Sequence, residues 1–386
     1  MLPGFFDSLR LRLDLSGLSC NRKTVGDPSI STHRRAVYEM GVVHSTPRGS
    51  PMSTPLNEQV VVITGASQGI GRETAREMAG RGAAVLAAAR NEQALSELVA
   101  EIRSAGGQAE FVVADVADYD QVERIGERAI ERFGRVDTWI NNAAVSIYAS
   151  VEQLEPDEME RLVRVNLLGQ MFGSKVALKR MKPRHAGTII NVGSALSERA
   201  VPLQAAYVAS KHGIAGFTEA LRLELLHEDA GIDVVLILPS SINTPLFAWA
   251  RSKLGVQPMP VPPVYEPNVV AEALCHAAEH GGREIVVGGW GKLLTIGQWL
   301  SPSLTDRYML QGDRMFKQQK TARPDDRRDN LFEPSTGPGH TTGEFGDKAK
   351  PTSLYTRLLE LHPNRKRAAA GALLLATVGA IRRAGR

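Results

Sequence analysis

Short runs of apolar residues, many of them β-branched, recur along the middle of the chain and alternate with stretches in which apolar and polar residues are mixed. The apolar runs lie at residues 60–63, 83–89, 109–115, 136–144, 187–194, 232–239 and 283–289. Runs of this kind are typical of strands buried on both faces, and most of the segments between them have the spacing of amphipathic helices. The alternation predicts an α/β fold with a doubly wound parallel sheet of about seven strands.

The two ends of the chain lack this alternation. Residues 1–51 mix polar residues, Pro, Ser and Arg without periodicity, which predicts a disordered extension with Met52 as the natural start. An Arg-rich transit peptide is the alternative, although acidic residues such as Asp7 are unusual in one. We therefore expect one folded domain over residues 52–300 and an irregular C-terminal extension, residues 301–386, that wraps around this domain or trails from it.

A short apolar run close to the C-terminus, residues 368–381, lies between clusters of Lys and Arg. As a helix it would cover about two thirds of a hydrocarbon core of roughly 30 Å, which is short for a membrane span. Two interpretations stay open: a helix docked on protein, or a helix that lies on a membrane surface and makes a weak contact with it.

Composition narrows the class of protein. With 46 Lys and Arg against 42 Asp and Glu the net charge is +4, and basic residues gather only near the C-terminus, which argues against a nucleic-acid groove. Cys20 and Cys275 are the only cysteines and lie far apart, so neither a disulfide framework nor a cysteine metal site is expected. These features favour a cytoplasmic protein, with membrane association through the tail left open.

The segment TGASQGIG, residues 64–71, places three glycines directly after the first predicted strand, and a helix-forming segment follows it. Gly65, Gly69 and Gly71 remove side chains where the backbone turns, and the N-terminus of the next helix attracts anions. Strand, glycine turn and helix together are typical of a Rossmann-type site for the pyrophosphate of a dinucleotide. A tight turn without a ligand is the alternative.

The residues after the second predicted strand bear on which dinucleotide binds. Sites that prefer NAD usually carry an acidic residue about 20 positions after the glycine turn, where it holds the adenosine ribose. This chain has Ala89 and Arg90 there, and Arg90 is suited to pair with the 2′-phosphate of NADP. The sequence therefore predicts NADP (NADPH) as the cofactor, with NAD as the alternative if Arg90 is only a solvated charge.

Tyr207 and Lys211 stand four residues apart in the segment YVASK, on a predicted helix, so that their polar ends share one face. A nearby ammonium group stabilises a phenolate, which suits Tyr207 to donating and accepting a proton. Ser194 closes the fifth predicted strand, where its hydroxyl can hydrogen-bond a carbonyl oxygen. On its own, a Tyr and a Lys at this spacing also fit an ordinary surface pair.

The combination of these motifs is more specific than any one of them. Seven features follow one another in the order and spacing of the short-chain dehydrogenase/reductase family: the glycine turn, Asp115, the segment NNAA at 141–144, Asn166, Ser194, Tyr207 and Lys211. The chain resembles this family over residues 57–290. The resemblance implies a homo-oligomeric enzyme that interconverts an alcohol and a ketone or aldehyde by hydride transfer with a nicotinamide cofactor and without a metal.

The resemblance also implies roles for individual residues. Tyr207 is expected to be the catalytic acid or base, with Lys211 lowering its pKa and holding the nicotinamide ribose. Ser194 is expected to polarise the substrate carbonyl, and Asn166 to help hold a water-linked proton relay. The residues expected to bind the cofactor are Gly65, Ser67, Gln68, Gly69, Ile70, Gly71, Arg90, Asp115, Val116, Asn142, Tyr207, Lys211 and Thr244.

Three positions depart from the family's usual sequence. Ala144 stands where the family often has Gly, Gln68 where its NADP enzymes often have a basic residue, and Ser240 where a Gly is common after the sixth strand. Gln68 leaves the expectation of NADP resting on Arg90. The resemblance implies that Thr244 meets the nicotinamide amide. Ser240 has less backbone freedom than glycine near this site, which could alter how the loop with Thr244 closes.

Residues 245–267 fall where the family carries its substrate lid. Six apolar side chains there are expected to line a pocket for a hydrophobic alcohol or carbonyl compound, unless they only pack on the sheet: Leu246, Phe247, Trp249, Leu254, Met259 and Val261. Two other classes of function stay open, namely a non-catalytic dinucleotide-binding regulatory protein and a membrane-attached scaffold.

Overall fold

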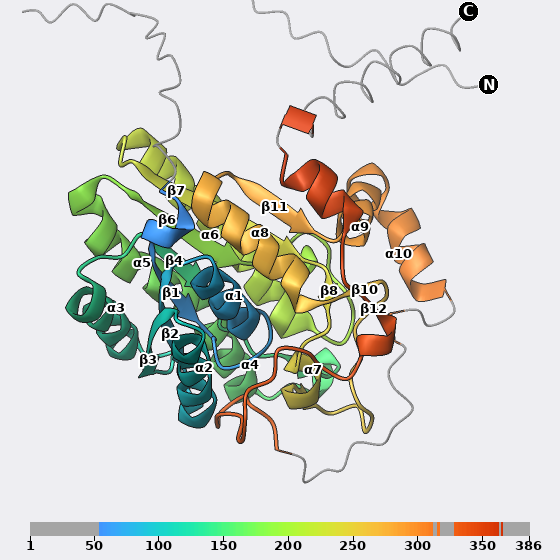
Figure 1. The fold of residues 1–386 in the computed structure, drawn as a ribbon. Coiled ribbons are helices and arrows are strands. Elements are labelled where there is room, and N and C mark those ends of the chain that lie inside the picture. Colours follow the sequence, from blue (N-terminus) through green and yellow to red (C-terminus); the bar gives the residue numbers. More distant parts are fainter. Residues whose placement is uncertain (1–53, 312–314, 317–327, 363, 366–386) are drawn as a thin grey trace, which may run out of the picture. The chain divides into compact units, whose positions relative to one another are not determined.

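The computed structural model describes residues 54–311, 315–316, 328–362 and 364–365, and all of them belong to one compact unit (Figure 1). The predicted N-terminal extension, Met52 and the apolar run at 368–381 lie outside the described residues. No described helix combines the length and the apolar character that crossing a membrane requires.

Seven strands form one parallel sheet, which confirms the fold class predicted from the apolar runs. The strands are β1 (Val60–Thr64), β2 (Ala84–Ala89), β3 (Gln108–Val113), β4 (Thr138–Asn141), β6 (Gly187–Val192), β7 (Ile232–Pro239) and β11 (Glu284–Val287). Some apolar runs are longer than the strands they contain. The run at 136–144 yields only β4, because from Asn142 onward the backbone leaves the sheet and approaches the glycine turn.

The direction in which strands are added reverses at the centre of the sheet, whose spatial order is β11-β7-β6-β4-β1-β2-β3. From β1 the chain adds β2 and β3 on one side, and then β4, β6, β7 and β11 on the other. In sheets of this type the ligand crevice lies beyond the carboxyl ends of the strands at the reversal, here β1 and β4. The fold therefore brings the residues that follow these strands to one edge.

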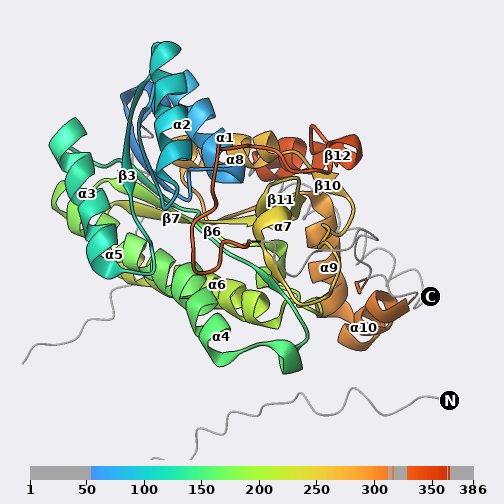
Figure 2. The same cartoon turned by 90° about the horizontal axis from the view of Figure 1, so that it is seen from below.

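Helices cover both faces of the sheet, because alternate residues of each strand point to opposite sides. Val61 and Ile63 belong to the core on one face, whereas Val62 belongs to the core on the other. The first face is covered by α1 (Gly69–Gly80), α2 (Glu92–Ser104) and α8 (Pro267–His280). The second is covered by α3 (Tyr119–Phe133), α4 (Pro156–Val163), α5 (Gly169–Met181) and α6 (Ala205–His227). Figure 2 shows these two layers on either side of the sheet.

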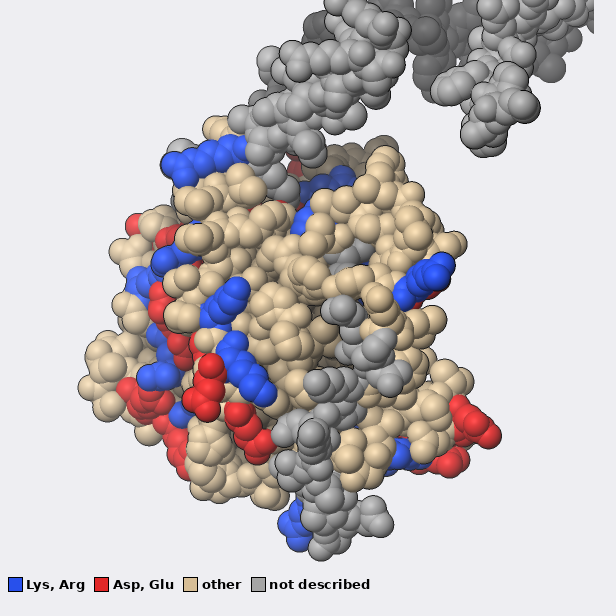
Figure 3. Space-filling view, turned by 90° about the vertical axis from the view of Figure 1, so that its right-hand side faces the viewer, with Lys and Arg blue, Asp and Glu red and all other residues tan. Residues whose placement is uncertain are grey.

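The described residues beyond β11 belong to the same unit. Two helices, α9 (Gly289–Leu300) and α10 (Pro302–Leu310), lie against each other. Figure 3 shows the side of the molecule that carries them, where wide uncharged areas separate the groups of charged side chains.

The described residues from 328 onward run from the loop after β2, where residues 330 and 332 bond Arg90, to β10. Figure 2 shows this part of the chain in orange-red, crossing the view between α2 and the short lid helix α7 (Leu246–Trp249). It then forms β12 (Ala349–Lys350), which pairs with β10 (Val264–Tyr265), and β10 also pairs with β8 (Ser241–Ile242). The π turn η8 (Thr356–Glu360) then lies against the edge strand β11, and the Gly288 N–H donates to Thr356 Oγ1 at 3.0 Å.

Candidate active site

The glycine turn links β1 to α1 and leaves no room for side chains. Gly65 and Gly69 have φ angles of 70° and 59°, in the left-handed region that favours glycine. A Cβ atom added to Gly65 would lie 2.7 Å from Ala143 Cα, and one added to Gly71 would lie 2.3 Å from the carbonyl oxygen of Gly65. The backbone therefore forms a close cradle at the N-terminus of α1, where the helix dipole favours an anion.

The segment after β4 is bonded to this cradle. Asn142 Nδ2 donates to the carbonyl oxygens of Thr64 and Gly65 at 3.0 and 3.3 Å. The N–H groups of Asn142 and Ala143 both donate to Thr64 Oγ1. Ala144 lines the same cavity, so the methyl group that replaces the usual glycine is accommodated beside the cradle.

Arg90, Asp115 and Val116, which follow β2 and β3, line the part of the cavity next to the cradle. The Arg90 guanidinium donates to two backbone carbonyls of the C-terminal segment, those of Asn330 and, at 2.8 Å, Phe332. Burial lowers the pKa of Arg90, and the charge of Asp115 opposes this shift. Arg90 is thus a half-buried group held by the chain itself and not a freely solvated charge.

Asp115 is held by a residue that the sequence did not single out. Arg161 on α4 forms an ion pair with Asp115 Oδ2 at 2.5 Å and donates through Nε to the Leu331 carbonyl at 3.0 Å. Arg161 therefore ties the loop after β3 to the C-terminal segment. Nothing in the local sequence marks it, because its partners lie 46 and 170 residues away.

Asn166 lies in a π turn, η3 (Arg164–Leu168), between α4 and α5. Its Oδ1 accepts from the Val145 N–H at 2.8 Å, and its Nδ2 donates to the Val145 carbonyl at 2.9 Å and to Ser210 Oγ at 3.3 Å. The side chain is fully buried and holds the loop after β4 in place. A π turn within a helix often marks a functional position.

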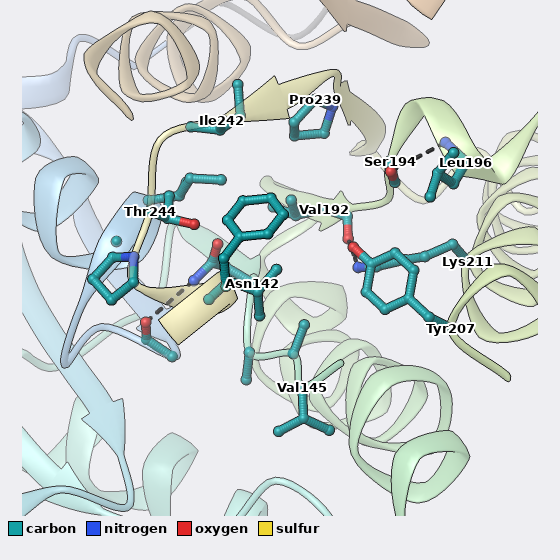
Figure 4. A pocket seen from close by; sticks show the side chains of 18 of the residues that line it. Asn142, Val145, Val192, Ser194, Leu196, Tyr207, Lys211, Pro239, Ile242 and Thr244 are labelled. Atoms are coloured by element: carbon teal, nitrogen blue, oxygen red, sulfur yellow. Dashed lines mark hydrogen bonds between the residues drawn. The ribbon is translucent and has the colours of Figure 1, made fainter. Parts of the chain in front are cut away.

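Ser194, Tyr207 and Lys211 line the cavity together (Figure 4). Lys211 Nζ lies 5.6 Å from the centroid of the Tyr207 ring and donates to the Val192 carbonyl at 2.8 Å. Ser194 follows β6 and caps a short 3-10 turn, because its Oγ accepts from the Leu196 N–H. The helix α6 supplies the tyrosine and the lysine, as the spacing predicts.

Burial moves the pKa values of these groups in directions that the sequence does not reveal. It raises the pKa of Tyr207 to about 12, although a hydrogen bond with Ser194 opposes the shift. It lowers the pKa of Lys211 to about 7. The shift of Tyr207 is opposite to the lowering expected from a neighbouring Lys211, because desolvation of the phenolate outweighs the other influences.

The segment after β7 keeps a regular backbone without a glycine. Among the described residues, the only non-glycine positions with positive φ are His185, Leu203 and Asp229, so Ser240 needs no left-handed conformation. Its N–H donates to the Val287 carbonyl and its Oγ to the Gly288 carbonyl.

Thr244 lines the cavity beside the cradle, with its Cβ 3.3 Å from a Cβ built on Gly69. The structure therefore places on one cavity all the expected site residues except Gly71 and Asn166, which support it from behind.

The lid residues divide into two groups. Leu246, Phe247, Met259 and Val261 line the cavity. Leu254 packs instead against a small apolar cluster that contains Phe247, and Trp249 is not among the lining residues. The lining residues that were not expected include Tyr148 and Trp290. Burial raises the pKa of Tyr148, and Trp290 Nε1 is buried without a hydrogen-bond partner among the described residues.

Comparison with known proteins agrees with this architecture. A family model described as short chain dehydrogenase matches residues 59–255. A protein of Bacillus subtilis strain 168 named uncharacterized oxidoreductase YxnA is 41% identical over 305 residues, which cover 78% of this chain and 85% of that protein.

Two solved structures are similar in fold. An alcohol dehydrogenase from the archaeon Thermococcus sibiricus, complexed with 5-hydroxy-NADP, is 26% identical with a TM-score of 0.53, and the match covers 59% of this chain and 95% of that one. A short chain dehydrogenase/reductase from Burkholderia phymatum, in complex with NAD, is 24% identical with a TM-score of 0.60, over 65% and 96% of the two chains. Taken with the match over residues 59–255 and the parallel sheet, these similarities identify the chain as a member of the short chain dehydrogenase family of oxidoreductases.

Proposed function

We propose that this chain is an NADP-dependent oxidoreductase that interconverts an alcohol and a ketone or aldehyde, with Ser194, Tyr207 and Lys211 as its catalytic residues. The observation that carries the proposal is the convergence of these three side chains with the glycine cradle on one cavity (Figure 4). The cavity lies at the carboxyl edge of the sheet, where the family's fold places its ligands.

The residues present fit a nicotinamide dinucleotide. The cradle lines the cavity with Gly65, Gly69 and Ile70, and the N-terminus of α1 that it forms favours an anion such as a pyrophosphate. Arg90 has five N–H donors, and the two bonds to Asn330 and Phe332 leave donors for a 2′-phosphate. No acidic residue stands at position 89 or 90, which favours NADP over NAD. When bound, the cofactor supplies or accepts the hydride.

The chain's own residues move the proton. With a pKa near 12, Tyr207 keeps its proton at neutral pH and can donate it to the oxygen of a substrate carbonyl. The Ser194 hydroxyl, which is within hydrogen-bond range of Tyr207, can donate to the same oxygen. When Tyr207 has lost its proton, the charged form of Lys211 stabilises the phenolate beside it. In the direction of oxidation the same groups act in reverse, and Asn166 holds the loop that borders the relay.

The lid favours a hydrophobic substrate. The apolar side chains that line the cavity with Tyr207 include Leu246 and Met259 of the lid, and Leu196 and Val201 from the segment between β6 and α6. Such a surface gains free energy by burying an apolar compound and offers little to a charged one.

The test is turnover of hydrophobic ketones and alcohols, followed by NADPH absorbance, for the wild type and for Tyr207→Phe. This change removes the transferred proton and little volume, so kcat should fall by at least roughly 10²-fold while the Kd for NADPH stays close to that of the wild type. A Tyr207→Phe protein that keeps its rate on a substrate of the wild type would overturn the catalytic assignment. A wild type that binds NADPH but turns over nothing would favour the regulatory alternative.

We propose two further contacts for the whole chain, with a second copy of itself and with a membrane surface. The first is supported by the exposed apolar side chains of α9 and α10, which include Trp299 and Leu304. The second is supported only by the sequence of the basic and apolar tail.

A further inference from the structure

The C-terminal segment Asp329–Phe345, hereafter the strap, lies across the cavity of the candidate active site, and Asn330, Pro334 and Ser335 form part of the cavity wall. We infer that the strap is a component of the dinucleotide site: it closes over the adenosine half of the cofactor, and Asn330 is one of its ligands. The inference rests on the proposed function, because the occupant is taken to be a nicotinamide dinucleotide.

One end of the strap is held by two arginines of the adenosine half. Arg90 donates to the carbonyls of Asn330 and Phe332, and Arg161 donates to the carbonyl between them, that of Leu331. Leu331 itself is fully buried in the core that covers one face of the sheet. Because Arg161 also pairs with Asp115, the strap is tied to the loops after both β2 and β3.

The middle of the strap lies against the glycine cradle. The His340 carbonyl accepts from the Gly69 N–H at 2.8 Å, in the first turn of α1, and the Gly337 carbonyl accepts from Asn91 Nδ2 at 3.1 Å. A Cβ atom on Gly339 would lie 2.3 Å from the Ser67 carbonyl oxygen. The middle of the strap thus packs on the glycine turn and occupies the Gly69 N–H, whereas Asn330, Pro334 and Ser335 line the cavity next to Arg90.

The other end of the strap reaches the substrate lid. The Phe345 N–H donates to Asn243 Oδ1 at 3.0 Å. The Phe345 ring stacks edge-on against Phe247 of α7 at 5.6 Å, and Phe247 lies 6.4 Å from Tyr148. Cofactor cover and substrate lid are therefore one continuous packed surface.

Asn330 carries the most direct sign of a ligand. The residue is only 7% exposed, and its Oδ1 is buried without a hydrogen-bond partner among the described residues. Its backbone is fixed on both sides, because its N–H donates to the Trp249 carbonyl and its carbonyl accepts from Arg90. A buried acceptor that has no partner in the protein is suited to a ligand that donates. The adenosine half offers such donors in its adenine amino group and ribose hydroxyls.

The first experiment measures equilibrium binding, by fluorescence or calorimetry, of whichever of NADPH and NADH the wild type binds more tightly. It is repeated with the matching adenosine fragment, ADP-ribose or its 2′-phosphate, and with reduced nicotinamide mononucleotide. Asn330→Ala should raise the Kd of the dinucleotide and the Kd of the adenosine fragment by about tenfold each. The Kd of the mononucleotide should stay unchanged. Asn268→Ala is the matched control, since Asn268 is an exposed asparagine that donates to the Pro351 carbonyl outside the cavity.

The second experiment tests whether the strap must open for exchange. Gly339→Ala forces a methyl group against the Ser67 carbonyl, whereas Gly346→Ala, just beyond the strap, meets nothing within 4 Å. The first change should raise the dissociation rate of the dinucleotide by about tenfold in stopped-flow displacement, and the second should not. Amide hydrogen exchange of residues 329–345 should also slow when the dinucleotide binds to the wild type.

The outcomes separate the two proposals. If the wild type binds neither dinucleotide, the proposed function fails and the strap has no such occupant. If it binds one but neither Asn330→Ala nor Gly339→Ala changes binding or dissociation, and exchange in the strap is unaffected, the strap is only structural and the proposed function stands. If Asn330→Ala raised the Kd of the mononucleotide as much as that of the adenosine fragment, the assignment of Asn330 to the adenosine half would be overturned.

Discussion

Lys211 combines full burial with a position in the centre of the site, and its titration gives a test that does not need a substrate. Burial lowers its pKa from an ordinary value of 10.5 to about 7. Between these two values the unfolded chain holds a proton on Lys211 that the folded protein lacks. Protonation then favours unfolding, so the contribution of Lys211 to the free energy of unfolding rises with pH through this window and is constant below pH 7.

The comparison with Lys211→Met isolates this effect. Urea unfolding of both proteins without cofactor, at several pH values from 6 to 9, gives the difference in free energy of unfolding, wild type minus variant. We expect this difference to be constant below pH 7. Above pH 7 it should increase with pH, with a slope that approaches about 1.4 kcal/mol per pH unit. Other titrating groups, such as Cys275, are common to both proteins and cancel. A difference that stays flat up to pH 9 would mean that Lys211 keeps an ordinary pKa.

Arg90 bears on the choice between NADP and NAD, but it also holds the strap. Its replacement should therefore weaken the binding of both cofactors. The informative quantity is the ratio of the Kd for NADH to the Kd for NADPH. We expect the wild type to prefer NADPH by roughly 10- to 100-fold, because a charge-assisted pair with the 2′-phosphate is lost in NADH. The double change Ala89→Asp with Arg90→Ala should reverse the ratio by adding repulsion.

A control for this prediction is Arg81→Ala, which removes an exposed arginine paired with Glu77 far from the cavity and should leave the ratio unchanged. Equal Kd values for NADPH and NADH in the wild type would contradict the proposed role and leave Arg90 as a residue that only fastens the strap.

At the scale of elements, the sheet could be predicted because each strand buried on both faces needs a continuous apolar run, and this run lies within the residues of the strand itself. The same holds for Tyr207 and Lys211, whose spacing places them on one face of α6. The strap has no such signal. Its bonds to Arg90 and Arg161 use backbone carbonyls, which every residue has, and they join positions 170 to 242 residues apart. The raised pKa of Tyr207 was missed for a related reason, since burial depends on the whole fold.

The element η8 gives a prediction about which part of the C-terminal segment stabilises the fold. Thr356 and Glu360 are buried beside β11, where Thr356 Oγ1 accepts from Gly288 and Glu360 Oε2 accepts from the Val286 N–H at 3.4 Å. Leu361 packs into the core on one face of the sheet. A chain that stops after Ser353 loses this cover of an edge strand, so its Tm should fall by roughly 5–10 °C and it should aggregate on heating.

A chain that stops after Arg365 keeps these contacts and is the matched control. Its Tm should equal that of the full chain, as measured by calorimetry at one protein concentration. It lacks the apolar run at 368–381 and the basic residues Lys366, Arg367, Arg382, Arg383 and Arg386, so it should also lose affinity for anionic liposomes at low salt. If the shortened chain co-floats with anionic liposomes to the same extent as the full chain, the tail is not the membrane contact.

At the scale of the whole molecule, α9 and α10 present apolar side chains that the described part of the chain leaves exposed, among them Leu293, Trp299, Leu300 and Leu304. Trp299 is 84% exposed. The two helices carry only Lys292 and Arg307 as basic residues, beside Asp306, which is a poor match to an anionic membrane surface. A mainly apolar surface with few charges of either sign is better suited to a second copy of the chain.

We therefore expect the wild type to be larger than its chain mass of 41.8 kDa in light scattering after gel filtration. Trp299→Glu should lower the measured mass towards that of one chain, because burying an unpaired carboxylate at an interface is unfavourable. The side chain is exposed in the single chain, so the fold and the Tm of the separated chains should change little. Leu226→Glu, at a position 70% exposed on α6, is the control and should leave the mass unchanged. An oligomer that survives Trp299→Glu but dissociates with Leu226→Glu would place the interface on α6 instead.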